Sequence, residues 1–155
     1  MTTQTNSSAL NVQSVNTFIE LMRASDTLTA RLRRIIAEHN LTVSQFHVLE
    51  ALLHLGPLSQ QALAKRLLKS GGNITKVIDN LEKNGMALRR QDEHDRRSYL
   101  IELTEKGEQL ISSIFPGHIG AIADLMSPLE GPELATLEEL CVKLGIHNTE
   151  NSSSA

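Results

Sequence analysis

The sequence predicts a mostly α-helical protein that carries one small β-hairpin. Apolar side chains recur at helical spacing through most of the 155 residues. The exception is residues 86–103, where two short strand-like stretches flank a run of charged residues. Aromatic side chains are scarce, with three Phe, one Tyr and no Trp. Leucine and isoleucine must therefore fill the core, which suits helix-on-helix packing.

The first half of the chain reads as three helices separated by short breaks. A long helix is expected between residues 11 and 39, with Asn40 as its stop. A second helix begins after Thr42, because Thr42 and Gln45 match a capping box, and it ends at Gly56. Ser59 is the expected N-cap of a third, shorter helix.

A tight break at residues 70–72 leads into a fourth helix, which we expect to end at Asn84, with Gly85 in the left-handed conformation. One of its stripes is apolar and the opposite stripe is polar. The apolar stripe is Ile74, Val77, Ile78 and Leu81, and the polar one is Asn73, Lys76 and Asn80, flanked by Thr75 and Asp79. The third and fourth helices thus form a helix-turn-helix, whose second helix enters the major groove of DNA in proteins of that kind.

Residues 86–90 and 99–103 are the expected strands, and residues 91–98 project between them as a charged tip. Thr104 caps a fifth helix, and a last helix covers about residues 133–144. The predicted organisation is a disordered tail (1–10), an N-terminal dimerisation helix (11–40), a winged helix-turn-helix (41–103), C-terminal dimerisation helices (104–146) and a second disordered tail (147–155). The terminal helices carry more apolar surface than the central module can cover, so we expect a homodimer rather than a monomeric bundle.

Charge is distributed unevenly along the chain. Residues 65–97 carry a net charge of +4 and residues 98–155 a net charge of −7, within a total of −3. A mildly acidic protein that gathers its cations on one helix and one hairpin is suited to dock that part against a polyanion. The scarcity of aromatic rings argues against a single-strand binder, which stacks bases on such rings. Double-stranded DNA is therefore the expected partner.

The candidate DNA contacts lie on the fourth helix, the turn before it and the hairpin tip. They are Lys69, Ser70, Gly71, Gly72, Asn73, Thr75, Lys76, Asn80, Asp95, Arg96 and Arg97. Small residues let the backbone approach phosphates, and the lysines neutralise them. Asn73 is suited to adenine or phosphate, and Thr75 to a base edge or a thymine methyl. Arg97 is suited to the minor groove, with Asp95 bracing its guanidinium. The alternative is a solvated helix face and an ordinary charged turn.

Two segments also resemble a known family. Residues 95–104, DRRSYLIELT, followed by EKG, resemble the wing signature of MarR-family transcriptional regulators, and residues 73–85 resemble the recognition helix of that family. The resemblance covers residues 18–144. It implies a homodimer that reads a pseudo-palindromic operator, with Asp95 and Arg97 as wing brace and minor-groove finger. It further implies a repressor that releases DNA when a small aromatic compound binds or a cysteine is oxidised. The start of the fourth helix resembles the branch that senses phenols and quinones.

An effector pocket is expected where the first, second and fifth helices meet. Candidate lining residues are Phe18, Met22, Arg23, His47 and His118, each of which is also suited to a plain core or surface role. Cys141 lies on the apolar stripe of the last helix, so a buried hydrophobic role is favoured over redox sensing. His47 and His54 share a helix face and could form half of a zinc site, but a core or surface role is favoured and no metal or cofactor is expected.

Other function classes are less well supported. The sequence shows no glycine-rich phosphate loop, nucleophile elbow or metal motif, so an enzyme is not expected. A protein-interaction module remains an alternative. No signal peptide and no apolar run of membrane-spanning length is seen, which predicts a cytoplasmic protein. The sequence therefore predicts a ligand-responsive, sequence-specific DNA-binding transcriptional regulator.

Overall fold

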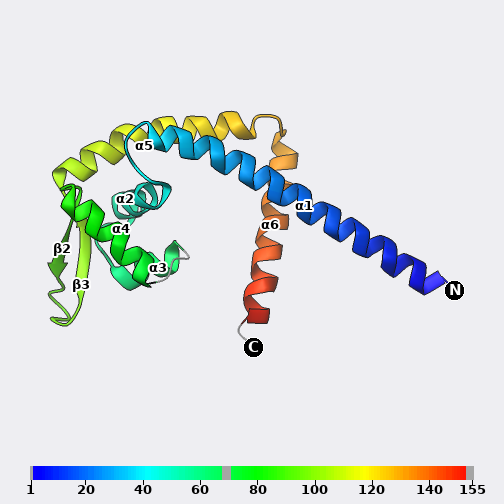
Figure 1. Ribbon diagram of the computed structural model, residues 1–155, viewed down its shortest axis with the longest axis horizontal. Helices are drawn as coiled ribbons and strands as arrows, with labels where there is room; N and C mark the ends of the chain where they lie inside the picture. Colours follow the sequence, from blue (N-terminus) through cyan, green and yellow to red (C-terminus); the bar gives the residue numbers. More distant parts are fainter. Residues whose placement is uncertain (1, 68–70, 153–155) are drawn as a thin grey trace. The chain divides into compact units, whose positions relative to one another are not determined.

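The computed structural model describes residues 2–67 and 71–152 and confirms the predicted fold class (Figure 1). Its elements are α1 (Thr2–Ala37), α2 (Val43–Leu55), β1 (Leu58–Ser59), α3 (Gln60–Arg66), α4 (Gly71–Lys83), β2 (Ala87–Gln91), β3 (Tyr99–Leu103), α5 (Glu105–Met126) and α6 (Gly131–Ser152). The chain divides into two compact units, residues 1–119 and 120–155. The candidate DNA-binding elements all lie in the first unit.

The first unit is built around one apolar core. Its fully buried side chains come from α2, α3, α4 and β3, with further contributions from the end of α1 and the first half of α5. They include Ile36, Phe46, Leu49, Leu63, Ile74, Ile78, Leu81, Ile101 and Ile111. The buried members of α4 belong to the stripe that helical spacing predicts. Because Ile36 and Ile111 enter the same core, α1 and α5 are anchored to the helix-turn-helix.

The predicted helix boundaries follow local capping chemistry. The Thr42 hydroxyl accepts a hydrogen bond from the Gln45 backbone N–H, and the Gln45 side chain accepts one from Thr42, which completes the capping box. Asn40, Gly56 and Gly85 have positive φ angles of 57°, 75° and 69°. This left-handed region is favoured by glycine and tolerated by asparagine, so each residue ends a helix where the sequence predicts.

The sheet has three antiparallel strands in the order β1-β3-β2. Ala87 pairs with Leu103 and Gln91 with Tyr99, so β2 begins one residue later than expected. The additional strand β1 pairs Leu58 with Ile101. A strand of two residues shows no alternation, so sequence periodicity could not reveal it. The β2–β3 hairpin projects beside α4 as the wing (Figure 1).

Within the described residues, helices extend over both segments that the sequence predicts to be disordered tails. Helix α1 begins at Thr2 and α6 continues to Ser152, where disorder was expected for residues 1–10 and 147–155. The polar composition suggested disorder, but neither segment contains a proline or glycine that would end a helix. This composition is compatible with the helices described for residues 2–10 and 147–152.

The second unit contains the end of α5 and all of α6. Helix α6 begins at Gly131, and the Glu133 carboxylate accepts a hydrogen bond of 2.8 Å from the Glu130 backbone N–H. Cys141 is exposed, so the expectation of a buried thiol is wrong. Leu140 and Val142 beside it are also exposed. Within the described ranges, no single helix is long and apolar enough to cross a membrane.

Candidate nucleic-acid interface

Helix α4 has one apolar face that is buried and one polar face that is exposed. Ile74, Ile78 and Leu81 are completely buried, whereas the expected polar face is turned outward. The exposed residues of that face are Gly71, Gly72, Asn73, Lys76 and Asn80. Gly71 and Gly72 form the helix start, and a Cβ atom added at either one would meet no described atom within 4 Å. No side chain of these two residues covers the backbone N–H groups at this end of the helix. A phosphate can therefore approach those groups closely. Lys69 and Ser70 fall outside the described residues.

The Thr75 side chain forms two hydrogen bonds within the protein. Its hydroxyl donates to the Gly71 carbonyl oxygen at 2.8 Å and accepts a hydrogen bond from Nε2 of Gln60 at the start of α3. Thr75 is half-buried, and its hydroxyl is already engaged. Its methyl group and one oxygen lone pair are thus the parts left for a base edge. The sequence did not reveal Gln60, because 15 residues separate the two partners.

The wing tip is shaped by two aspartates. Asp92 accepts a hydrogen bond of 2.9 Å from the His94 backbone N–H, and its own N–H donates to the Ser98 carbonyl oxygen at 3.0 Å. The bond from His94 is the main reason that the pKa of Asp92 is lowered. The carboxylate stays ionised and holds the turn closed.

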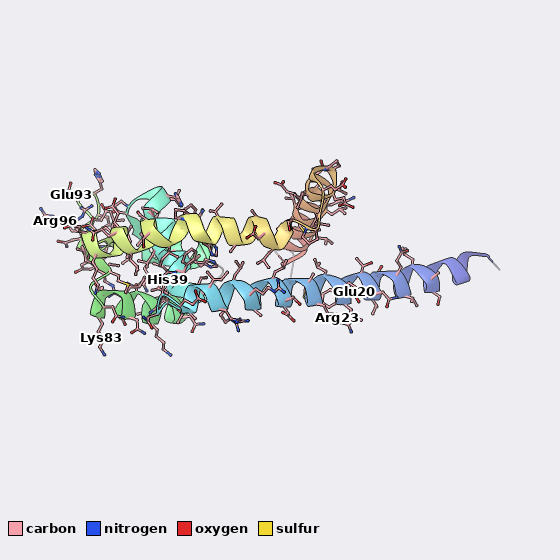
Figure 2. All side chains as sticks on the ribbon, turned by 90° about the horizontal axis from the view of Figure 1, so that it is seen from above. Glu20, Arg23, His39, Lys83, Glu93 and Arg96 are labelled. Carbon is pink, nitrogen blue, oxygen red and sulfur yellow. The ribbon has the colours of Figure 1, made fainter. Side chains whose placement is uncertain are left out.

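Asp95 contacts Arg97 differently from the expected brace. Its carboxylate accepts a hydrogen bond of 3.0 Å from the Arg97 backbone N–H. In the described part of the chain, no ion pair joins this carboxylate to the Arg97 guanidinium. Because Asp95 and Arg97 are two residues apart in the turn, the nearest donor to the carboxylate is the Arg97 main chain, and this bond orders the turn. Arg96 and Arg97 remain exposed, and Figure 2 shows Arg96 and Glu93 pointing outward from the wing.

The two arginines of β2 are neutralised by neighbouring acids. Arg89 pairs with Asp79 at 2.7 Å and also with Glu82, both on α4. Arg90 pairs with Glu102 across the hairpin at 2.9 Å, and this contact raises the pKa of Arg90. The positive charge that the sequence places on this strand is therefore not directed at an outside partner.

Within α4 and the β2–β3 hairpin, the cations that remain lie on α4 and at the wing tip. Lys76, Lys83, Arg96 and Arg97 are exposed and form no ion pair with any other described residue. Figure 2 shows Lys83 extending from the end of α4. Both elements that would enter the grooves of DNA therefore keep available positive charge, as do exposed residues of α1 and α3 such as Arg31 and Lys65.

The five candidate effector residues do not form one site in the structure. Phe18, Met22 and Arg23 are exposed on α1, and Arg23 pairs with Glu20 at 3.1 Å (Figure 2). His47 instead lines a cavity of approximately 340 Å³ between α2 and α3. The other lining residues are Glu50, Ala51, His54, Arg66 and Leu67. The chain therefore has a polar cavity of its own, with no part of α1 in it.

His118 is buried in the first unit with 6% of its surface exposed. Its ring lies 4.4 Å from that of Phe46, and its Nδ1 atom has no hydrogen-bond partner among the described residues. Burial lowers the pKa of His118, while the nearby Glu50 opposes that effect. Within the same residues, no group of three or more His, Cys, Asp or Glu side chains could hold a metal ion.

A helix-turn-helix whose recognition helix carries exposed lysines, together with an arginine-tipped wing, defines a DNA-binding module. The sequence profile of the MarR family matches residues 41–99, which cover this module. The chain is 38% identical over 136 residues to the uncharacterized HTH-type transcriptional regulator YkoM of Bacillus subtilis strain 168, covering 88% of each chain. It is 33% identical to the HTH-type transcriptional regulator MhqR of the same strain, over 87% of this chain and 93% of MhqR.

The fold is shared with solved regulators. The organohalide-sensing regulator RdhR, in its 2,4-dichlorophenol-bound form, superposes with a TM-score of 0.77 over 87% of this chain and 80% of its own, at 18% identity. The chain belongs to the MarR family of winged helix-turn-helix transcriptional regulators. It is a DNA-binding regulator and not an enzyme, as the sequence predicts.

Proposed function

We propose that the protein represses transcription by placing α4 in the major groove and the wing tip in the adjacent minor groove of its operator. The main observation is that the unpaired cations Lys76, Lys83, Arg96 and Arg97 lie on these two elements, whereas Arg89 and Arg90 are neutralised within the protein. Phosphate contacts from α4 set the register, and Asn73 and Thr75 read bases. Its site of action is the cytoplasm, where the operator DNA lies.

A gel-shift titration with the DNA upstream of its own gene tests this proposal. We expect nanomolar binding that weakens steeply with salt, because Lys and Arg contacts release counterions from the phosphates. A reporter fused to the same promoter should be silenced by the protein. Equal affinity for operator and scrambled duplex, or activation of the reporter, would contradict the proposal.

The functional unit is proposed to be a homodimer. Large apolar side chains lie exposed along α1, including Leu10, Val12, Val15, Phe18 and Ile19, and Phe18 keeps 61% of its surface exposed. In a monomer these side chains would stay in water, and each Å² of apolar surface left unburied forgoes ~25 cal/mol of free energy. A second copy that covers it also supplies the second recognition helix that a pseudo-palindrome needs. Light scattering should give twice the chain mass, and Phe18→Asp should lower that mass toward the monomer.

An aromatic acid or phenol is proposed as the effector, bound in the cavity between α2 and α3. Arg66, His47 and His54 offer donors for a carboxylate or phenolate, and Glu50 can accept a hydrogen bond from a hydroxyl. The volume of approximately 340 Å³ is within the range of small-molecule sites. Because Arg66 ends α3, a ligand there sits beside the helix-turn-helix. It would release DNA by binding the DNA-free conformation more tightly.

Thermal-shift titrations with 4-hydroxybenzoate and 2,4-dichlorophenol test the effector site. A ligand that binds the folded state raises the melting temperature, and the same compound should release operator DNA. His47→Ala should abolish the shift, whereas Arg31→Ala on the exposed face of α1 should leave it intact. A shift that survives His47→Ala would place the effector elsewhere.

A further inference from the structure

The contacts between α4 and β2 centre on one arginine. The Arg89 guanidinium donates to Asp79 Oδ1 at 2.7 Å through one nitrogen and to a Glu82 carboxylate oxygen through the other. The Arg89 backbone N–H donates to the second Glu82 oxygen at 2.9 Å. Glu82 is therefore held by both the main chain and the side chain of the same wing residue.

These contacts join the two parts that would enter different grooves. Asp79 and Glu82 lie on successive turns of α4, the recognition helix, and Arg89 lies in the first strand of the wing. The Arg89 side chain is 24% exposed, against 31% for Glu82 and 58% for Asp79. A planar guanidinium that binds two carboxylates has a fixed direction, which a lysine or a single contact would not give.

We infer that Arg89 is a positioning residue for DNA reading: it sets the spacing between α4 and the wing so that both can enter their grooves together. This inference rests on the proposed DNA-binding mode. Arg89 then acts through Asp79 and Glu82 and touches no phosphate. The acids have a function as well, because they keep a strand arginine from being captured by the DNA backbone.

Arg90 provides a matched control. It is the next residue of β2 and carries the same charge, but its partners Glu102 and Glu93 belong to the hairpin. Removing Arg90 takes one charge from the strand and leaves the contacts between α4 and β2 in place. Lys76 provides the opposite control, because it is exposed on α4 and is proposed to contact phosphate.

The first measurement is the salt dependence of DNA binding by Arg89→Ala, Arg89→Lys, Arg90→Ala and Lys76→Ala. Loss of one phosphate contact reduces the slope of log K against log salt by about 0.9. We expect that reduction for Lys76→Ala and an unchanged slope for Arg89→Ala. Specific affinity should fall at least 10-fold in Arg89→Ala and also fall in Arg89→Lys, with nonspecific affinity unchanged. Arg90→Ala should lose less than 3-fold.

The second measurement follows the spacing directly and needs no DNA. In a Cys141→Ser background, spin labels at Lys83→Cys and His94→Cys report the distance between the end of α4 and the wing tip by pulsed EPR. Dilution with unlabelled chain removes distances between subunits. We expect one narrow distribution that broadens in Arg89→Ala and stays narrow in Arg90→Ala.

The outcomes separate this inference from the proposed function. A salt slope that falls by about 0.9 in Arg89→Ala, with an unchanged distance distribution, would make Arg89 a phosphate contact and overturn the inference. Unchanged affinity in Arg89→Ala would also overturn it. If the unsubstituted protein showed no specific DNA binding, the proposed function would fail, and the EPR result would still report whether Arg89 fixes the spacing.

Discussion

Gly107 of α5 lies directly against the main-chain carbonyl of Met86: a Cβ atom at position 107 would be 1.9 Å from that oxygen. The surrounding contacts bring the two segments together. The Thr104 backbone N–H donates to the Met86 carbonyl oxygen at 3.1 Å, and the Thr104 hydroxyl donates to the Gly85 carbonyl oxygen at 2.6 Å. Residues 104–107, with the sequence TEKG, therefore pack the start of α5 against the turn that follows α4. Thr104 supplies the hydrogen bonds, and Gly107 allows the close approach.

Gly107→Ala should destabilise the protein, because the added methyl group meets backbone rather than a side chain that can rotate. We expect a loss of ~3 kcal/mol or more in the free energy of unfolding, at the upper end for overpacked sites. Gly117→Ala is the matched control, since its Cβ would meet no described atom within 4 Å. That change removes a flexible glycine from a helix and should stabilise by ~0.5–1 kcal/mol. Urea unfolding of both variants checks this, and equal stabilities would contradict the close contact.

Stability should fall in mildly acidic solution because of His118. Burial lowers its pKa in the folded protein below the value of ~6.5 expected when unfolded. Between these two values the unfolded chain binds the proton more readily, so stability is lost as pH falls below ~6.5. The loss approaches ~1.4 kcal/mol per pH unit for one proton.

His118→Phe keeps a ring against Phe46 and removes the titrating group. Chemical unfolding of both proteins at pH 7.5, 6.5 and 5.5 checks the prediction. The stability difference between variant and unsubstituted protein should shift in favour of the variant as pH falls. A difference that is constant over this range would show that His118 does not titrate on unfolding.

Features set by local sequence were predicted well, and features set by distant partners were not. Asn40 and Gly85 end helices through their own backbone preferences, and Thr42 finds its partner three residues away. Arg89 is different, because its partners lie 7 and 10 residues earlier and only the packing of β2 beside α4 brings them together. Its charge counts toward the +4 of residues 65–97, whereas the structure shows it in ion pairs within the protein.

Arg97→Ala should weaken operator binding strongly. The guanidinium is exposed at the wing tip, and an arginine in a narrow minor groove benefits from the enhanced negative potential there. We expect a loss of ~1–3 kcal/mol, about 10-fold or more in affinity. Arg31→Ala removes the same charge from α1 and should change affinity much less. Fluorescence anisotropy with a labelled operator measures both, and similar losses in the two variants would reduce the role of Arg97 to general electrostatics.

Thr75 should read DNA through its methyl group. Its hydroxyl already donates to Gly71 and accepts from Gln60, so a base can meet the methyl face, or the one remaining oxygen lone pair, without breaking these bonds. Thr75→Ser keeps the hydroxyl and removes the methyl, whereas Thr75→Val does the reverse. We expect Thr75→Ser to lose preference for a thymine in the half-site and Thr75→Val to retain it, since apolar contact to the thymine methyl carries that preference.

Selection of bound duplexes from a randomised half-site, followed by sequencing, compares the variants at every position. Gln60→Ala should change the preference at this position much less than Thr75→Ser does, because Thr75 keeps its methyl group and its bond to Gly71. Loss of the thymine preference in Thr75→Val with retention in Thr75→Ser would show instead that the hydroxyl leaves its internal partners to contact the base.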